Sequence, residues 1–347
     1  MRHSMSNVTI AIACLFAVAI FAPAAHAQMA PPANTSHHAD DTPLAATRSI
    51  LLWPNGAPGA LSGGGDLDTP SLDIYLPATN PTHVGVIICP GGSYMHLSLA
   101  KEGSDVAAWL NAHGVAGFVL HYRLGPRYRY PAAFDDATRA MRYVRSHSTE
   151  LQIDPKHIGI WGFSAGGHLA ADVSTHFDAG KPDSADPIER VSSRPDFSIL
   201  CYAVISMKQG VTHAFSELNL LGPTPDPALV ALLSNEDHVT ADTPPAFLYH
   251  TTDDKTVPVM NSVLYFEAMQ KAGVPVELHI FQKGPHGTGL AQNIPGIPAL
   301  AEWPTLLANW MMANKWVAAS SSAAATPAAT ATPATAANPT AAAAGKP

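Results

Sequence analysis

Short apolar runs recur along residues 49–316 and alternate with stretches whose apolar positions have helical spacing. The run at residues 84–89 contains no polar residue, which is typical of a strand covered on both faces in the centre of a parallel sheet. Residues 72–76 alternate in the manner of a half-buried edge strand. Further apolar runs predict strands at residues 116–122, 158–161, 197–205, 246–250 and 276–281.

Helical spacing fills the intervals between these runs. Residues 101–112 place Val106 and Leu110 on one face before Gly114, and an amphipathic stretch over residues 134–144 follows Pro131. Further helices are expected directly after residue 168, at residues 261–272 and at residues 303–310. Strand and helix thus alternate, which predicts an α/β fold with a mostly parallel central sheet flanked by helices.

Two polar segments interrupt this alternation. Residues 176–195 are rich in Asp, Ser and Pro, and we expect an inserted loop over the mouth of a site. Residues 208–243 mix short helical pieces with prolines and predict a small cap. His213 and Asn219 lie in this cap segment, where either could touch a substrate or be an ordinary surface polar residue.

The two ends of the chain have a different composition. Residues 1–27 have a basic start, a short apolar run and Ala-His-Ala at the end, the pattern of a signal peptide. We expect export to the periplasm or beyond and no membrane attachment after cleavage. Residues 28–48 and the Ala/Thr/Pro-rich tail at 317–347 are expected to be disordered, leaving a domain at 49–316.

Composition narrows the possible partners. The chain of 347 residues is 47% hydrophobic and 13% charged, with a formal net charge of −8, so no basic surface for nucleic acid is expected. The 17 histidines are scattered without metal-ligand spacing, so neither a metal nor a cofactor is predicted. Cys89 and Cys201 both fall in predicted strands and are expected to be buried free thiols.

The strongest chemical motif is the sequence GFSAGGH at residues 162–168, which stands between a predicted strand and a predicted helix. In that context G-x-S-x-G is a nucleophile elbow, a strained turn that needs small neighbours. Because glycine is common in this chain, G-x-S-x-G alone is weak evidence for an elbow. The predicted strand before it and the predicted helix after it make the prediction specific. Ser164 is the expected nucleophile, and the N–H of Ala165 at the helix start is an expected oxyanion donor.

A second motif, PGGSY at residues 90–94, follows the buried strand at 84–89. A Gly-Gly loop lets backbone N–H groups face a ligand without a Cβ in the way, so Gly92 and Ser93 are candidate oxyanion donors. A plain glycine turn is the alternative. Arg123, after the next strand, is expected to brace the loop by hydrogen bonding.

The loops after the last two predicted strands supply the partners of the nucleophile. Asp253 and Asp254 compete for the acid of a triad, and the spacing D-x-x-V-P selects Asp254. His286, between two glycines, is the expected general base. The order Ser164, Asp254, His286 is the one that α/β hydrolases use. Asp135 and Asp136, in the first turn of a predicted helix, are expected to be caps.

These motifs together resemble the bacterial acetyl xylan esterase-like members of the α/β-hydrolase superfamily, close to dienelactone-hydrolase and lipase-like esterases. The resemblance is carried from about residue 49 to 316 by PGGSY, KEG at 101–103, YRL at 122–124, GFSAGGHLA at 162–170, NLLG at 219–222, TPP at 243–245, DD at 253–254 with VP at 257–258, and HG at 286–287. Ser93 departs from the family pattern, which usually has Gly there.

The resemblance implies an α/β-hydrolase fold with a small cap after the elbow, and a secreted serine esterase. The expected substrate is a small ester or an acylated oligosaccharide or polysaccharide, with acetyl groups on xylan as the first choice. Two alternatives stay open: a carboxylesterase or feruloyl-type esterase for another small ester, and a catalytically inactive carbohydrate-binding homologue.

Overall fold

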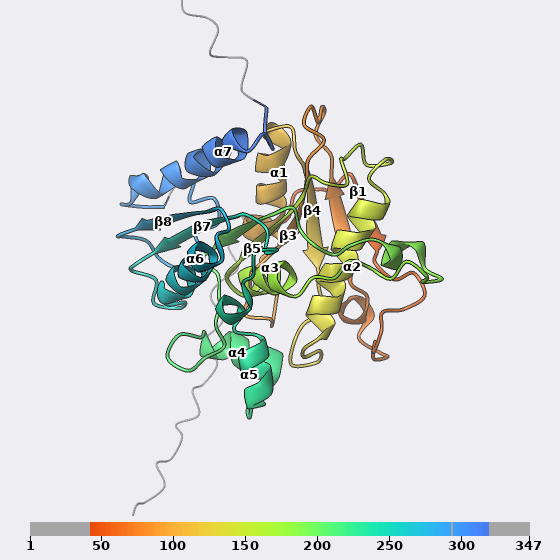
Figure 1. Ribbon diagram of the computed structural model, residues 1–347, viewed down its shortest axis with the longest axis horizontal. Coiled ribbons are helices and arrows are strands. Elements are labelled where there is room, and N and C mark those ends of the chain that lie inside the picture. The colour runs from red at the N-terminus through yellow and green to blue at the C-terminus, as the bar shows by residue number, and fades with distance from the viewer. Residues whose placement is uncertain (1–41, 293, 319–347) are drawn as a thin grey trace, which may run out of the picture. The chain divides into compact units, whose positions relative to one another are not determined.

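The computed structural model describes residues 42–292 and 294–318 (Figure 1). The predicted signal peptide, most of the segment at 28–48 and almost all of the tail at 317–347 lie outside the described residues.

Within these residues, eight strands form one sheet in the order β1-β2-β4-β3-β5-β6-β7-β8. The β1–β2 and β2–β4 pairs are antiparallel and all other pairs are parallel. Every predicted strand is present, and β1 was not predicted because most of its residues are exposed and show no apolar alternation. The strands are β1 (Arg48–Leu51), β2 (Ser71–Tyr75), β3 (Gly85–Cys89), β4 (Ala116–His121), β5 (Ile158–Phe163), β6 (Phe197–Cys201), β7 (Ala246–Thr251) and β8 (Val276–Phe281).

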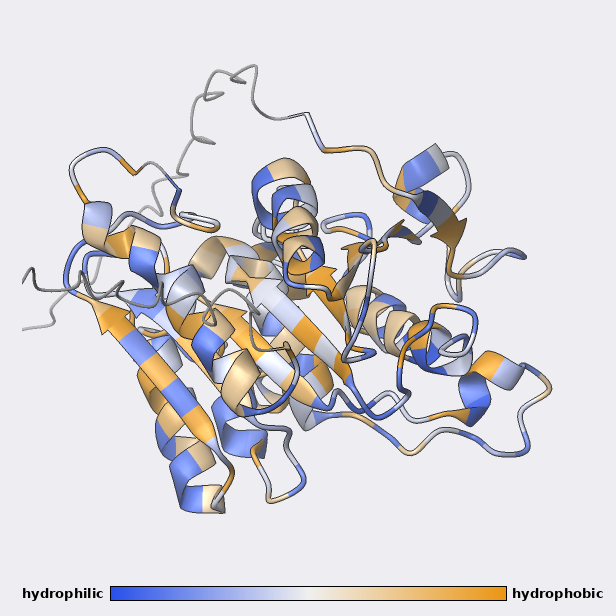
Figure 2. Cartoon of the chain, turned by 90° about the horizontal axis from the view of Figure 1, so that it is seen from above, coloured by the Kyte–Doolittle hydropathy of each residue, from blue (hydrophilic) through white to orange (hydrophobic). Residues whose placement is uncertain are grey.

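Helices cover both faces of the sheet, as predicted. Apolar side chains of α1 and α7 belong to the same buried cluster as Val86 and Ile88 of β3, whereas those of α2, α3 and α6 belong to the cluster on the opposite face, with Ile87 and Cys89. Figure 2 shows hydrophobic residues concentrated on the strands, between these two helical layers. The helices are α1 (Asp105–Ala112), preceded by a π-helical turn η2 (Ala100–Ser104), α2 (Ala132–Ser146), α3 (Ser164–Thr175), α4 (Ala214–Leu221), α5 (Pro227–Leu232), α6 (Met260–Ala272) and α7 (Trp303–Ala313).

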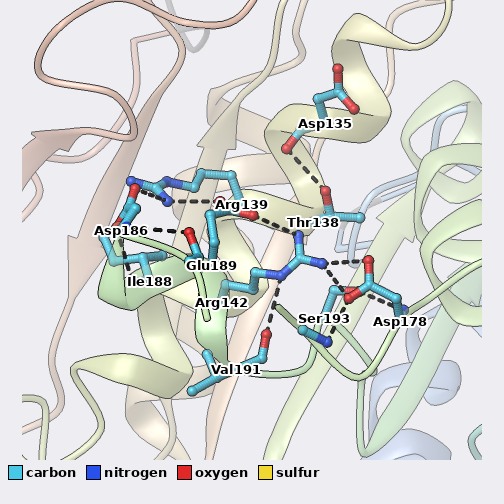
Figure 3. Close-up of polar contacts among 12 residues, drawn as sticks. Asp135, Thr138, Arg139, Arg142, Asp178, Asp186, Ile188, Glu189, Val191 and Ser193 are labelled. Carbon is cyan, nitrogen blue, oxygen red and sulfur yellow. Dashed lines mark hydrogen bonds and ion pairs between the residues drawn. The ribbon is translucent and has the colours of Figure 1, made fainter. Parts of the chain in front are cut away.

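The segment at 176–195 does not cover the site, and that prediction is wrong. Figure 3 shows it held against α2, where Arg142 pairs with Asp178 and Arg139 pairs with Glu189. The segment begins where α3 ends, at the opposite end of that helix from Ser164. Its polar composition predicted a surface loop but did not show at which end of the strands the loop lies.

Asp136 is not a helix cap, which corrects a second prediction. Its carboxylate is fully buried and accepts hydrogen bonds from the Nε and Nη2 groups of Arg123, at 2.8–3.1 Å, and from the Arg123 backbone N–H at 2.8 Å. Arg123 also donates to the carbonyl oxygens of Pro58 and Ala132, so the expected bracing role of Arg123 is confirmed. Asp135 lies in the first turn of α2 and makes no capping hydrogen bond.

Other features of the described residues bear on the predictions. Cys89 and Cys201 are free and buried, as expected. The cap segment at 208–243 contains the short helices α4 and α5, as predicted. Across residues 42–292 and 294–318, no helix has the length and apolarity that a membrane crossing requires. The same residues hold no group of His, Cys, Asp and Glu side chains suited to a metal ion.

Candidate active site

The turn between β5 and α3 places Ser164 in a left-handed backbone conformation, with φ of +52°. A Cβ at position 166 would lie 2.1 Å from the carbonyl oxygen of Cys89, and one at position 162 would lie 2.2 Å from the carbonyl oxygen of Gly166. Neither position can hold a side chain without moving backbone. Gly166 is therefore required by the close approach of α3 to β3, and Gly162 by the close approach of β5 to α3. Ser164 is the first residue of α3, as a nucleophile elbow requires.

Three predicted side chains meet at the carboxyl ends of β5, β7 and β8. The Nε2 atom of His286 lies 2.8 Å from the Oγ of Ser164, and its Nδ1 lies 2.7 Å from the Oδ2 of Asp254. The other carboxylate oxygen of Asp254 accepts the backbone N–H groups of Thr256 and Val257 at 2.8 and 2.9 Å. This contact chain joins a hydroxyl, an imidazole and a carboxylate that are far apart in the sequence, and it is the geometry of a serine-hydrolase triad.

The neighbouring aspartates have different surroundings. Asp253 forms a surface ion pair with Lys283 at 3.0 Å, whereas the Asp254 side chain is 1% exposed. Burial raises the pKa of Asp254, but hydrogen bonds from His250 and His286 outweigh it and hold this pKa well below its usual range. Asp254 is therefore ionised at neutral pH, and it is the aspartate that can orient the imidazole of His286.

A second histidine, which was not predicted from the sequence, lies behind Asp254. His250 is fully buried at the end of β7, with Nε2 3.0 Å from the carbonyl oxygen of Val257 and 3.4 Å from the Oδ2 of Asp254. Its Nδ1 lies 2.8 Å from the Oγ of Ser262. A carbonyl only accepts, so these partners assign the proton to Nε2 and make Nδ1 the acceptor of the Ser262 hydroxyl. The only sequence signal was a histidine inside an apolar strand.

The loop after β3 lies directly against the serine. A Cβ at position 91 would be 3.0 Å from the Cβ of Ser164. The N–H of Gly91 donates to Glu102, whereas among the described residues the N–H groups of Gly92, Ser93 and Ala165 have no protein acceptor. Those three are the amides named in the sequence analysis, and their role in binding an oxyanion stays a prediction.

Two contacts hold this loop in shape. Gly92, Ser93 and Tyr94 all have positive φ angles, of +133°, +57° and +59°. The Nδ2 group of Asn219, from α4, donates to the carbonyl oxygen of Ser93 at 2.9 Å. The Tyr94 hydroxyl lies 2.8 Å from the Nδ1 of the buried His168. Asn219 thus holds the candidate oxyanion loop from the cap side.

His213 is half-buried at the start of α4, with its Nδ1 2.9 Å from the Oγ of Ser216. Burial lowers its pKa, the imidazole of His286 lowers it further, and Asp254 opposes these effects. His213 therefore lies within electrostatic range of the three-residue contact chain and is neutral at neutral pH.

The fold and this constellation define the class of the protein, an α/β hydrolase. The BD-FAE family matches residues 72–269, more than half of the sequence, and the chain belongs to that family.

Relatives of known kind agree with this assignment. An acetylxylan esterase of Xylanibacter ruminicola is 39% identical over 219 residues, covering 62% of this chain and 43% of the relative. The endo-1,4-beta-xylanase B of Butyrivibrio fibrisolvens is 33% identical over 229 residues, covering 65% and 35%. The chain thus spans less than half the length of these relatives.

Solved structures match over a larger share of their own length. An acetyl ester-xyloside bifunctional hydrolase from Caldicellulosiruptor lactoaceticus superposes with a TM-score of 0.74 and 44% identity, covering 79% of this chain and 98% of that one. A carboxylesterase from Lactobacillus plantarum gives a TM-score of 0.62 at 25% identity, covering 78% and 99%. The family and these matches place the chain among the carboxylic ester hydrolases.

Proposed function

We propose that this chain is an exported serine esterase that removes acetyl or other short acyl groups from acylated carbohydrate, with acetylated xylan as the leading candidate. The observation that carries the proposal is the contact chain from Ser164 through His286 to Asp254. The names of the relatives support an ester substrate and a xylan-type carbohydrate.

In the proposed reaction, the Oγ of Ser164 attacks the ester carbonyl while the Nε2 of His286 takes the hydroxyl proton. Asp254, held ionised by its hydrogen bonds, keeps the proton of His286 on Nδ1 and stabilises the imidazolium. The oxyanion is bound by the N–H groups of Ala165 and Gly92, with Ser93 as a third donor; each donor contributes about 3 kcal/mol to lowering the barrier. His286 returns its proton to the leaving alcohol, then activates water to release the acid.

Glycoside cleavage is a second candidate, because one relative is named a xylanase and one solved structure a bifunctional hydrolase. A glycosidase needs two carboxyl groups facing one bond. Asp254 and Glu102, the two carboxylates that hydrogen-bond to His286 and to the candidate oxyanion loop among the described residues, have their oxygens occupied by hydrogen bonds within the protein. The geometry therefore favours the esterase.

The test is a substrate panel with acetylated xylan, acetylated monosaccharides, aryl esters of increasing acyl length, feruloyl esters and an aryl xyloside. Release of acetate that disappears in Ser164→Ala and persists in Ser174→Ala supports the proposal. Ser174 is a matched control, since it is a buried serine of the same helix whose hydroxyl is bonded to the carbonyl oxygen of Ala170. Acetate release that survives Ser164→Ala contradicts the proposal, and cleavage of the xyloside alone replaces it with the second candidate.

Export is part of the proposal and has its own test. Expression of the full chain in a bacterial host should place the protein in the periplasm or the medium with Gln28 as its first residue. A protein that stays in the cytoplasm with residues 1–27 attached contradicts this part without affecting the esterase assignment.

A further inference from the structure

The turn η2 (Ala100–Ser104) carries a buried acidic side chain that the proposed reaction does not use. Glu102 is 4% exposed. Its Oε2 accepts the N–H of Gly91 at 2.8 Å, and its Oε1 accepts the hydroxyl of Tyr202 at 2.8 Å. One carboxylate thus joins the candidate oxyanion loop to the residue that follows β6.

Tyr202 extends this connection to the loop that carries the histidine. Its hydroxyl accepts the N–H of Gly289 at 2.8 Å, and its ring meets the His286 ring edge-on, with centroids 5.0 Å apart. Burial, with the Glu102 carboxylate beside it, raises the pKa of Tyr202 well above its usual range. The hydroxyl therefore keeps its proton and can donate it to Glu102 while accepting from Gly289.

Close packing reinforces the same connection. A Cβ at position 289 would lie 2.6 Å from the Cγ of Lys101 and 3.1 Å from the Lys101 carbonyl oxygen. The Nζ of Lys101 also donates to the carbonyl oxygen of Gly287 at 3.3 Å. The η2 turn is thus in direct contact with both loops that flank Ser164. Tyr202 itself has a φ of +36°, an uncommon conformation for a residue with a side chain, which is retained where surrounding contacts enforce it.

We propose that Glu102 and Tyr202 are positioning residues that fix the candidate oxyanion loop and the His286 loop in one relative arrangement. The proposal rests on the esterase function proposed above. Glu102 orients the Gly91 peptide and accepts a hydrogen bond from its N–H. The N–H groups of Gly92 and Ser93 are then the ones that remain to face an oxyanion. Donors fixed before the reaction need no reorganisation when the charge develops.

The first test replaces each member of the pair and measures kcat and KM for p-nitrophenyl acetate. Glu102→Ala should lower kcat by about 10- to 100-fold with KM within about 3-fold, because the lost contact acts on transition-state donors rather than on substrate binding. Glu102→Gln can still accept the Gly91 N–H and donate to the Tyr202 oxygen, and should stay within about 5-fold of the parent kcat. Tyr202→Phe, which preserves the ring, should lower kcat by about 10-fold.

A matched control exists elsewhere in the chain. Asp68 accepts the N–H of Gly64 at 2.7 Å and the hydroxyl of Tyr128 at 2.6 Å, the same pairing of a glycine amide and a tyrosine with one carboxylate. Neither Asp68 nor Tyr128 hydrogen-bonds to the triad or to the candidate oxyanion loop. Asp68→Ala and Tyr128→Phe should lower the melting temperature and leave kcat per active site within about 2-fold.

Active sites are counted by titration with diethyl p-nitrophenyl phosphate, which reacts with the nucleophilic serine, so that loss of folded protein is separated from loss of rate. The double variant Glu102→Ala/Tyr202→Phe should resemble Glu102→Ala alone, since both changes break one network.

An unchanged kcat in Glu102→Ala and Tyr202→Phe, or effects that multiply in the double variant, overturn the positioning role. If Glu102→Ala does not fold, Tyr202→Phe and Glu102→Gln decide the question. Activity that survives Ser164→Ala refutes the esterase function itself, which is a separate outcome from a failure of the positioning role.

Discussion

Replacing Asp254 by asparagine gives a sharp test of how the site sets the protonation of His286. One oxygen of Asp254 accepts two backbone N–H groups, from Thr256 and Val257, and the other accepts the Nδ1–H of His286. In Asp254→Asn the amide oxygen must remain on the side of the two backbone donors, since the reverse orientation would lose both hydrogen bonds and oppose N–H groups. The amide NH₂ then faces His286, and the Nε2–H of His250, 3.4 Å from the Asp254 Oδ2, keeps its closer acceptor, the carbonyl oxygen of Val257 at 3.0 Å.

An NH₂ group can only donate, so it selects the tautomer of His286 in which Nδ1 accepts and Nε2 carries the proton. That proton points at the Oγ of Ser164, 2.8 Å away, and the imidazole can no longer accept the hydroxyl proton. The reverse orientation of the amide costs two backbone hydrogen bonds at about 1–3 kcal/mol each, so the neutral His286 tautomer with its proton on Nε2 is favoured. A loss of the general base by this route lowers kcat by about 10⁴-fold, which corresponds to about 5 kcal/mol of barrier.

The assay is p-nitrophenyl acetate hydrolysis at neutral pH, with melting temperature as the check on folding. Asp253→Asn is the matched control: it makes the same change one residue earlier, where the side chain pairs with Lys283 at the surface. This control should stay within about 2-fold of the parent activity, because a surface ion pair contributes at most about 1 kcal/mol to the free energy of unfolding. A folded Asp254→Asn protein that keeps more than about a tenth of the parent kcat, or an Asp253→Asn protein with the larger loss, would show that Asp254 does not set the tautomer of His286.

Further predictions concern the surroundings of the site. Asn219→Ala removes the hydrogen bond to the Ser93 carbonyl and should lower kcat about 5-fold without changing the melting temperature by more than a few degrees; an unchanged kcat contradicts it. Arg123→Met leaves the Asp136 carboxylate buried without its partner, so the free energy of unfolding measured in urea should fall by about 3–5 kcal/mol. A fall of less than about 1 kcal/mol would contradict this prediction. The pKa of Asp254 is lower in the folded state than in the unfolded state. Its ionised carboxylate therefore stabilises the fold at every pH above the unfolded-state pKa, and this stabilisation is lost as the pH falls to the folded-state pKa. The difference in melting temperature between the parent and Asp254→Asn should therefore shrink from about pH 5 to pH 2, and a difference that grows would oppose this sign.

The sequence predicted the features that depend on local pattern. The run at residues 84–89 became β3 because an all-apolar strand is stable only when both of its faces are covered. Gly162 and Gly166 were predicted from an elbow motif, and their neighbours leave no room for a Cβ. The choice of Asp254 over Asp253 followed from turn spacing, which fixes which carboxylate faces inward.

Features that depend on long-range packing could not be predicted in this way. The sequence around Asp136 does not show that Arg123, which follows β4, pairs with this residue of α2. The carboxylate was therefore predicted to be a helix cap. The contact of Glu102 with Tyr202 spans 100 residues, and the sequence marked Glu102 only as part of the KEG motif at residues 101–103, with no sign of its partner. His250 was hidden in the same way, because a histidine in a strand has no motif until its neighbours are known.

The proposed reaction requires that Ser164 becomes acylated during turnover. The direct measurement mixes the protein with excess p-nitrophenyl acetate, quenches the reaction in acid before deacylation, and locates the acetyl group by peptide mass spectrometry. We expect one acetyl group on Ser164, present in the parent and in Asp253→Asn and absent in Ser164→Ala. Turnover by the parent with no acetylated Ser164, together with undiminished hydrolysis by Ser164→Ala, would contradict it.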